Sequence, residues 1–156
     1  MKDNARIDQF RMISRQYSDI SILMHEAIAR RAGLTGTDHK YLGFILQKGE
    51  MTAGELSNAT GLTTGAVTGL IDRLEKKKLV KRQFDKNDRR KVIIVPNQQN
   101  TTKLLSPLFK ELQDKTLKLL SSLSENEIEV IEKYFTAAIK IMKETTETLN
   151  GKQWKA

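Results

Sequence analysis

Residues 52–74 read TAGELSNATGLTTGAVTGLIDRL, and this stretch decides the fold. Thr52 and Glu55 have the spacing of a capping box, in which the threonine hydroxyl accepts from the amide three residues on and the carboxylate reaches back to the cap. The pattern predicts a helix over 52–60. Gly61 can adopt the left-handed conformation that often follows a helix end, and Thr63 can cap a second helix over 63–77. Two short helices joined by a glycine turn are typical of a helix-turn-helix.

The two predicted helices combine an apolar face with a face of small or polar residues. The second helix carries two interior glycines, each of which costs about 1 kcal/mol relative to alanine. A helix tolerates that cost where its backbone comes close to DNA or to another helix, and the sequence leaves both explanations open. The apolar positions are Leu56, Leu62, Val67, Leu70, Ile71 and Leu74, and the outward positions are Thr63, Thr64, Gly65, Thr68, Gly69, Asp72 and Arg73.

A basic β-hairpin is predicted over 79–95, directly after the second helix. Residues 79–84 and 91–95 have the composition of strands, the turn-rich segment 85–88 separates them, and Pro96 ends the second strand. Residues 72–91 hold ten Lys/Arg and four Asp/Glu, a net charge of +6, whereas the whole chain carries +8. A run such as Lys76-Lys77-Lys78 is also explained as a solvated helix end. The charge concentrated beside a helix-turn-helix favours a polyanionic partner.

These features together predict binding to double-stranded DNA. The second helix of such a motif enters the major groove, and a basic hairpin beside it reaches the minor groove. Two other functions stay open: a protein-interaction module whose hairpin binds an acidic protein surface, and an architectural protein that binds DNA without regard to sequence.

Long amphipathic helices flank the motif, so the predicted fold class is mainly α with a small β-hairpin wing. Helices are expected over 7–31, from 35 to 46, over 101–122 and from 124 to 149, the last with a net charge of −3 over 124–148. Their apolar faces exceed what a small DNA-reading core can cover. Pairing with a second copy is therefore expected, which would set two recognition helices about 34–36 Å apart on a near-palindrome. A purely intrachain core is the alternative.

Composition excludes several classes of function. The 156 residues include no cysteine, which excludes disulfides and thiolate zinc sites and fits a reducing cytoplasm. The N-terminal sequence lacks a signal-peptide core and no apolar run reaches membrane-spanning length, so no membrane association is expected. No phosphate loop, catalytic triad or metal-ligand cluster is recognisable, and the two histidines, His25 and His39, are too few for a metal site. The chain is expected to be neither an enzyme nor a cofactor-binding protein.

The segment GLTTGAVTGLIDRLEKKKLVKR followed by DKNDRRKVIIV resembles the MarR family of bacterial winged helix-turn-helix transcriptional regulators. The resemblance implies one subunit over 1–156, with an N-terminal dimerisation helix at 7–34, a DNA-binding lobe at 35–96 and C-terminal dimerisation helices at 97–149. It implies a cytoplasmic homodimer that usually represses, and that releases its operator when a small aromatic or anionic effector binds between the lobes.

The resemblance also assigns roles to single residues. Asp88 and Arg90 match an Asp-x-Arg motif in which the aspartate steadies the hairpin and the arginine enters the minor groove. Arg73 matches a basic residue late in the recognition helix. Lys78 departs from the family, because many relatives have glycine there, and so does Val95-Pro96-Asn97, where many have Leu-Thr and a glycine.

The expected DNA contacts fall in both parts of the motif. Arg73 is expected to donate two bonds to a guanine edge, worth about 1–3 kcal/mol of discrimination, while the threonines touch phosphates and a thymine methyl. Arg90 suits the narrow minor groove of A·T-rich DNA. The DNA-binding candidates are Thr63, Thr64, Gly65, Thr68, Arg73, Lys76, Asp88, Arg89, Arg90 and Lys91, and Tyr17, His39, Tyr41 and Phe44 are candidates for an effector cleft that helical spacing explains equally well as core.

Overall fold

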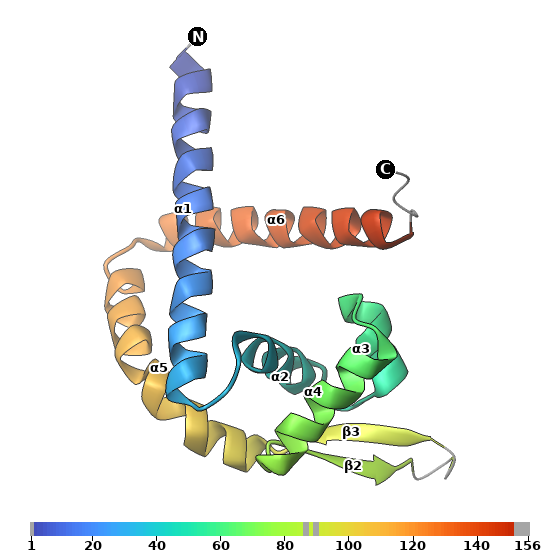
Figure 1. Cartoon of the computed structure of the whole chain (residues 1–156). Coiled ribbons are helices and arrows are strands. Elements are labelled where there is room, and N and C mark those ends of the chain that lie inside the picture. The colour runs from blue at the N-terminus through green and yellow to red at the C-terminus, as the bar shows by residue number, and fades with distance from the viewer. Residues whose placement is uncertain (1, 86–87, 89–90, 152–156) are drawn as a thin grey trace. The chain divides into compact units, whose positions relative to one another are not determined.

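The computed structural model describes residues 2–85, 88 and 91–151 of the chain (Figure 1). The chain divides into two units, residues 1–109 and 110–156, which are described separately below. The elements in order are α1 (Lys2–Arg31), α2 (Gly36–Lys48), β1 (Met51–Thr52), α3 (Ala53–Thr60), α4 (Thr64–Lys76), β2 (Val80–Phe84), β3 (Val92–Pro96), α5 (Gln98–Leu120) and α6 (Glu125–Gly151).

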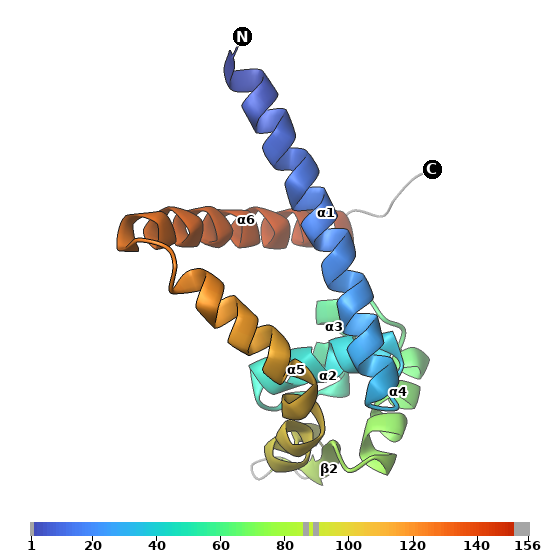
Figure 2. The same ribbon diagram turned by 90° about the vertical axis from the view of Figure 1, so that its left-hand side faces the viewer.

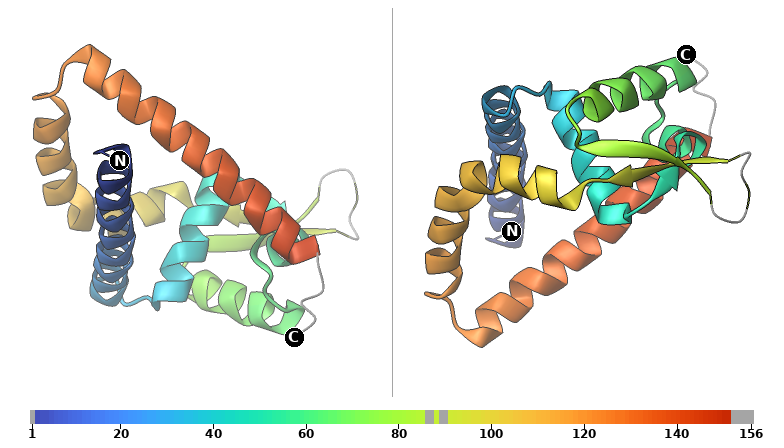
Figure 3. Two further views of the ribbon diagram at one scale, coloured as in Figure 1. Left: turned by 90° about the horizontal axis from the view of Figure 1, so that it is seen from above. Right: turned by 90° about the horizontal axis from the view of Figure 1, so that it is seen from below.

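The predicted fold class is confirmed, with one strand added. β2 and β3 form the expected antiparallel hairpin, with Arg82 opposite Ile94 and Phe84 opposite Val92. The short β1 joins the other edge of β3 and gives the sheet order β1-β3-β2. Two residues are too few to show an alternating pattern, and one of them, Thr52, is also the cap of α3. In both views of Figure 3 the hairpin projects away from the helices α2, α3 and α4.

Thr and Ser side chains cap the helix starts, and the cap of α2 is only half of a capping box. At α3 the Thr52 amide donates to Glu55 Oε2 at 2.7 Å and the Glu55 amide donates to Thr52 Oγ1 at 3.1 Å, so the capping box is complete. The same reciprocal pair joins Ser124 and Glu127 at the start of α6. At α2 the Thr35 hydroxyl accepts from the Asp38 amide, but the Asp38 carboxylate accepts from Arg73 and does not return to the cap. Gly61 ends α3 with a φ of 71°, the left-handed conformation that the sequence predicts.

The core of the first unit lies between the helices and the sheet. The four apolar side chains of α4 that the sequence assigns to packing are fully buried, and Leu56 of α3 packs against them. They are Val67, Leu70, Ile71 and Leu74. Burying one such side chain contributes about 1.5–3 kcal/mol. The core comprises Ala29, Leu34, Leu42, Ile45, Met51, Leu56, Val67, Leu70, Ile71, Leu74, Leu79, Val80 and Ile94. This packing fixes α4 against α2 and the sheet and leaves its opposite face outward.

The long flanking helices contribute little to that core. Only the last turns of α1 lie beside α2, burying Ile28 and Ala29, and the N-terminal turns extend away from the lobe (Figure 2). In the second unit, no residue of α6 up to Leu149 is buried. Its apolar side chains are instead exposed, among them Phe135 and Ile139. The units join inside α5, three residues after Pro107.

The turn between α4 and β2 holds a lysine in a left-handed conformation. Lys78 has a φ of 58°, which costs a residue with a Cβ about 1–2 kcal/mol. Its amide donates to the Glu75 carbonyl and the next amide, of Leu79, donates to the Leu74 carbonyl. The Asn100 side chain donates to the Lys78 carbonyl at 3.0 Å. These bonds hold the turn that a glycine would adopt without strain.

Within the described part of the chain, no helix has both the length and the apolarity needed to cross a bilayer.

Candidate nucleic-acid interface

The outward face of α4 is small, exposed and uncharged over its first two turns. No charged side chain occurs from Thr63 to Ile71. Thr63 accepts from the Ala66 amide as the helix cap, at 3.3 Å, and Thr68 donates its hydroxyl proton to the Thr64 carbonyl at 3.0 Å. The exposed residues are Thr63, Thr64, Gly65, Ala66 and Thr68. This surface presents methyl groups, hydroxyl oxygens and bare main chain.

The two glycines of α4 differ in their surroundings. A Cβ built at Gly65 would meet nothing within 4 Å, whereas one at Gly69 would lie 3.4 Å from Nη1 of Arg73. Packing inside the described chain therefore gives no reason for a glycine at position 65. Of the two explanations that the sequence leaves open, close approach of an external molecule is the one that fits Gly65.

Arg73 has a protein partner that the sequence analysis does not predict. Its Nε donates to both carboxylate oxygens of Asp38, at 3.1 and 3.0 Å, and its Nη2 donates to Oδ1 at 2.7 Å. The Asp38 residue is only 2% exposed, while the Arg73 side chain is 51% exposed. Hydrogen bonding to Asp38 raises the pKa of the Arg73 guanidinium further above its usual range. The pair ties the last turn of α4 to the first turn of α2.

The pair with Asp38 occupies only one edge of the Arg73 guanidinium. A guanidinium carries five N–H donors, and the bonds to Asp38 come from Nε and Nη2. The side chain is 51% exposed, so the end formed by Nη1 and Nη2 can still face a base while Asp38 holds the other edge. A bidentate arginine–guanine pair contributes about 1–3 kcal/mol of discrimination. The guanine contact of Arg73 stays a prediction.

A second arginine ties the hairpin to the recognition helix. Nη2 of Arg82, on β2, donates to Asp72 at 2.5 Å, and its Nη1 donates to Glu75. The Arg82 amide donates to Glu75 Oε1 at 2.8 Å, and this main-chain bond is the main reason that the pKa of Glu75 is lowered. In the sequence Arg82 is one of the ten basic residues over 72–91. The structure gives it a bracing role and neutralises two carboxylates on α4.

The remaining DNA-binding candidates are placed as follows. Lys76 and Lys91 are exposed at the end of α4 and beside the hairpin turn. The Asp88 amide donates to Asp85 Oδ1 at 3.1 Å and the Asp88 carbonyl accepts from the Lys91 amide at 2.9 Å, so Asp88 is part of the hydrogen-bonded turn. Arg89 and Arg90 lie outside the described residues.

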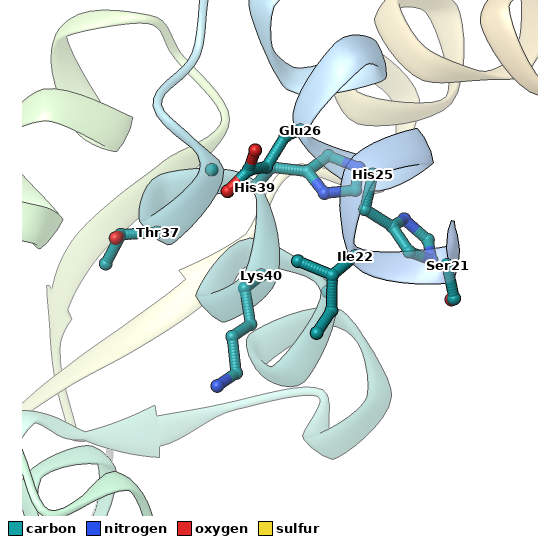
Figure 4. Close-up of a pocket in the computed structure, with 9 residues that line it drawn as sticks. Ser21, Ile22, His25, Glu26, Thr37, His39 and Lys40 are labelled. Carbon is teal, nitrogen blue, oxygen red and sulfur yellow. The ribbon is translucent and has the colours of Figure 1, made fainter. Parts of the chain in front are cut away.

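A pocket of about 630 Å³ lies between α1 and α2 (Figure 4). Ser21, His25 and Glu26 reach it from α1, and His39 and Lys40 from α2. Of the predicted cleft residues, His39 lines this pocket, whereas Tyr41 and Phe44 pack against the core and Tyr17 is 66% exposed on α1. The sequence does not predict that His25, Glu26 and Lys40 line a cleft, because spacing along one helix does not show which second helix faces it.

At this pocket the ring of His39 stacks on Phe109, and the ring of His25 lies tilted against both. The ring centroids of His25 and His39 are 5.4 Å apart, and that of Phe109 is 5.9 and 6.1 Å from them. Burial, and then the proximity of His25, lower the pKa of His39 below its usual 6.5. His39 follows Asp38 directly, so the pocket and the Arg73 pair share the first turn of α2. Among the described residues, no group of three His, Asp or Glu side chains is arranged to hold a metal ion.

Comparison with known proteins agrees with this geometry. The sequence profile of the MarR family matches residues 32–91, the span from the residue after α1 to the residue before β3. The chain is 43% identical over 129 residues to the uncharacterised HTH-type transcriptional regulator YcgE of Bacillus subtilis strain 168, covering 83% of each protein. It is 29% identical over 121 residues to the HTH-type transcriptional regulator MhqR of the same strain, covering 78% of this chain and 82% of MhqR.

Solved structures share the fold. A MarR family protein from Bacillus stearothermophilus superposes with a TM-score of 0.70 at 24% identity, covering 89% of this chain and 96% of that one. A variant of MepR from S. aureus, solved bound to an oligodeoxyribonucleotide, superposes with a TM-score of 0.55 at 24% identity, covering 86% of this chain and 95% of that one.

Proposed function

Because this chain belongs to the MarR family of winged helix-turn-helix transcriptional regulators, we propose that it is a homodimeric, sequence-specific repressor that a small ligand releases from DNA. In this proposal α4 lies in the major groove, with Thr63, Thr64, Gly65 and Thr68 toward the bases. The hairpin lies along the adjacent minor groove, with Arg89, Arg90 and Lys91 near its tip. Lys76 contacts a phosphate.

The observation that carries the proposal is the pairing of an exposed recognition helix with a braced hairpin. α4 buries one face in the core and leaves its first two turns open. Arg82 joins the hairpin to Asp72 and Glu75 of the same helix, so the two DNA-contacting elements have a fixed relation. A protein that binds two adjacent grooves of DNA needs its helix and hairpin held at a fixed distance and angle, because both must dock at once.

Dimerisation follows from apolar surface that the described chain does not cover. Ile13, Tyr17 and Ile20 on α1, and Ile131, Phe135 and Ile139 on α6, each form an exposed stripe at helical spacing. Contiguous apolar surface of this kind marks protein–protein interfaces in soluble proteins. A two-fold dimer would present two copies of α4 to a near-palindromic operator about one helical turn apart.

The effector site is proposed at the pocket between α1 and α2. Lys40 would attract an anionic group, and the rings of His25 and His39 would pack against an aromatic one. Asp38, beside His39, holds Arg73 of the recognition helix, so a ligand that moves the start of α2 would also move α4. A regulator of this kind acts on DNA in the cytoplasm.

The proposal is tested by selecting bound duplexes from a random pool and measuring their dissociation constants by mobility shift. We expect recovery of a two-fold-related sequence and a fall in affinity of about 10³–10⁵ between 50 and 200 mM salt, if the dimer neutralises about 6–10 phosphates. Arg90→Ala should weaken binding at least tenfold, or roughly 1.4 kcal/mol. Arg11→Ala, which removes the same charge from the N-terminal half of α1, should not.

Three results would contradict the proposal. Failure to bind any duplex at low salt would favour a protein-interaction module. Equal affinity for every duplex would favour an architectural role. An unchanged affinity of the Arg90→Ala variant would remove the hairpin from the mechanism.

A further inference from the structure

Resting on the proposed function, we infer that the first two turns of α4 read the half-site through thymine methyl groups, by methyl and main-chain contact. Each half-site should contain T·A pairs where these two turns dock. Guanines beside those thymines should contribute little through their major-groove edge.

The first support is the chemistry of the exposed surface. Thr63, Thr64 and Thr68 are exposed along the first turns of α4 and each carries a methyl group, as does Ala66. In the major groove the methyl group of thymine is the apolar feature of the base edges, and threonine and alanine methyls are its usual partners. With its hydroxyl proton donated to the Thr64 carbonyl, Thr68 is more an apolar contact than a donor.

The second support is the space at Gly65. A Cβ there would meet nothing within 4 Å, so the free protein does not need a glycine at this position. The missing side chain allows the helix backbone to come nearer to the base edges than a helix with a Cβ would. Thymine methyl groups project into the major groove and suit such an approach.

The third support is the absence of charge beside these methyl groups. No charged side chain occurs from Thr63 to Ile71. The arginine of the helix, Arg73, lies in its last turn, where Nε and Nη2 bond to buried Asp38. Over its first two turns α4 therefore offers the bases methyl and main-chain groups alone.

The DNA side of the inference is tested on a duplex that the wild-type chain selects from a random pool. Each thymine of a half-site is replaced in turn by deoxyuridine, which lacks only the methyl group. We expect one to three positions per half-site at which affinity falls about fourfold, the loss of one buried methyl contact. Replacing a guanine beside those thymines by 7-deazaguanine, which lacks only N7, should leave the affinity within about twofold.

The protein side is tested by Gly65→Ala, with Gly43→Ala of α2 as the matched control. Both glycines are themselves exposed on a helix, and both have open space for a Cβ. Both variants should therefore gain helix propensity and raise Tm by about 2–4 °C. Only Gly65→Ala should lose DNA affinity, by about tenfold or more, because the new methyl group meets the base edges.

The outcomes separate the inference from the proposed function. Sequence-specific binding that tolerates deoxyuridine at every position, or that fails with 7-deazaguanine beside those thymines, would overturn the inference and leave the repressor proposal standing. Unchanged binding of Gly65→Ala to the selected duplex would likewise overturn the close approach of α4. A chain that selects no duplex at all would overturn the proposed function and the inference together.

Discussion

The lobe from α2 to β3 and the flanking helices use apolar residues in opposite ways. In the lobe, Leu42, Leu56 and Leu74 have no solvent exposure, and they enclose a core that the lobe supplies largely by itself. On α6, Phe135 and Ile139 are 47% and 51% exposed although they follow the same helical spacing. Apolar residues at the same helical spacing therefore serve folding in the lobe and, in our proposal, assembly in the flanking helices. Substitutions should therefore separate into those that unfold the chain and those that dissociate it.

The largest effect is expected for a charge placed on the exposed stripe of α6. Ile139→Glu would bury an unpaired carboxylate in the proposed dimer interface, and we expect a loss of about 3–5 kcal/mol of dimerisation free energy. Sedimentation should show monomer at concentrations where the wild-type chain is dimeric, with the lobe still folded by circular dichroism. Asn126→Glu, which adds the same charge in the first turn of α6, is the control. A variant that unfolds instead of dissociating would break the comparison.

The second effect tests the ion pair that ties α2 to α4. Arg73→Met leaves Asp38 buried without a partner and should lower the free energy of unfolding by about 3–5 kcal/mol. Asp38→Asn leaves Arg73, whose side chain is half exposed and can be solvated, so the cost should be only about 1.5–3 kcal/mol. Urea titration of both variants measures the difference. Equal costs would show that the burial of Asp38 does not set the strength of the pair.

The third effect is a pH dependence of stability. The pKa of His39 is lowered by burial, so the unfolded chain takes up a proton before the folded chain does. The stability contributed by neutral His39 is present above its unfolded pKa of 6.5 and should fall as pH drops below it, by at most about 1.4 kcal/mol per pH unit. The carboxyls of Glu55 and Glu75, with pKa values below 4.5, lose their contributions only at lower pH. Unfolding midpoints measured from pH 7.5 to 5.5 should decline less in His39→Phe than in the wild-type chain.

The smallest effect reverses sign between two neighbouring lysines. Lys78→Gly removes the strain of a left-handed lysine and should stabilise the chain by about 1 kcal/mol. Lys77→Gly, at a position with a φ of −87°, should destabilise it by about 0.5–1 kcal/mol, because glycine gives the unfolded chain more freedom. Thermal unfolding of both variants checks the sign. A stabilising effect at both positions would mean that the turn conformation is not the cause.

The sequence predicts most of the lobe because its signals are local. The Thr52 and Glu55 cap, the Gly61 turn and the buried face of α4 all depend on residues within a few positions of one another, and they form as predicted. What the sequence misses depends on distant partners. Asp38 looks like half of a local capping box, and nothing near it in the sequence indicates that Arg73, 35 residues later, takes its carboxylate. The strand β1 is hidden for the same reason, since it exists only through its pairing with β3.

The candidate site also divides into residues whose placement depends on local spacing and residues whose role depends on distant partners. The exposed residues Thr63, Thr64, Gly65 and Thr68 follow from the periodicity of one helix, and the structure leaves them on its outward face. The roles of the arginines could not be predicted from spacing, because they depend on which carboxylates the fold brings near. Arg73 and Arg82 resemble DNA ligands in the sequence and are bonded to Asp38, Asp72 and Glu75 in the structure.

The most direct test of the account uses the absence of cysteine from the chain. Asn58→Cys places a single thiol on the exposed side of α3, beside α4, and Thr136→Cys places one on α6. Each is labelled with an iron chelate that cleaves nearby DNA, and the cleavage sites are mapped on a selected duplex. The account predicts two cleavage clusters about one helical turn apart from the α3 label and none from the α6 label. Cleavage from α6 without cleavage from α3 would contradict the docking of α4 into DNA.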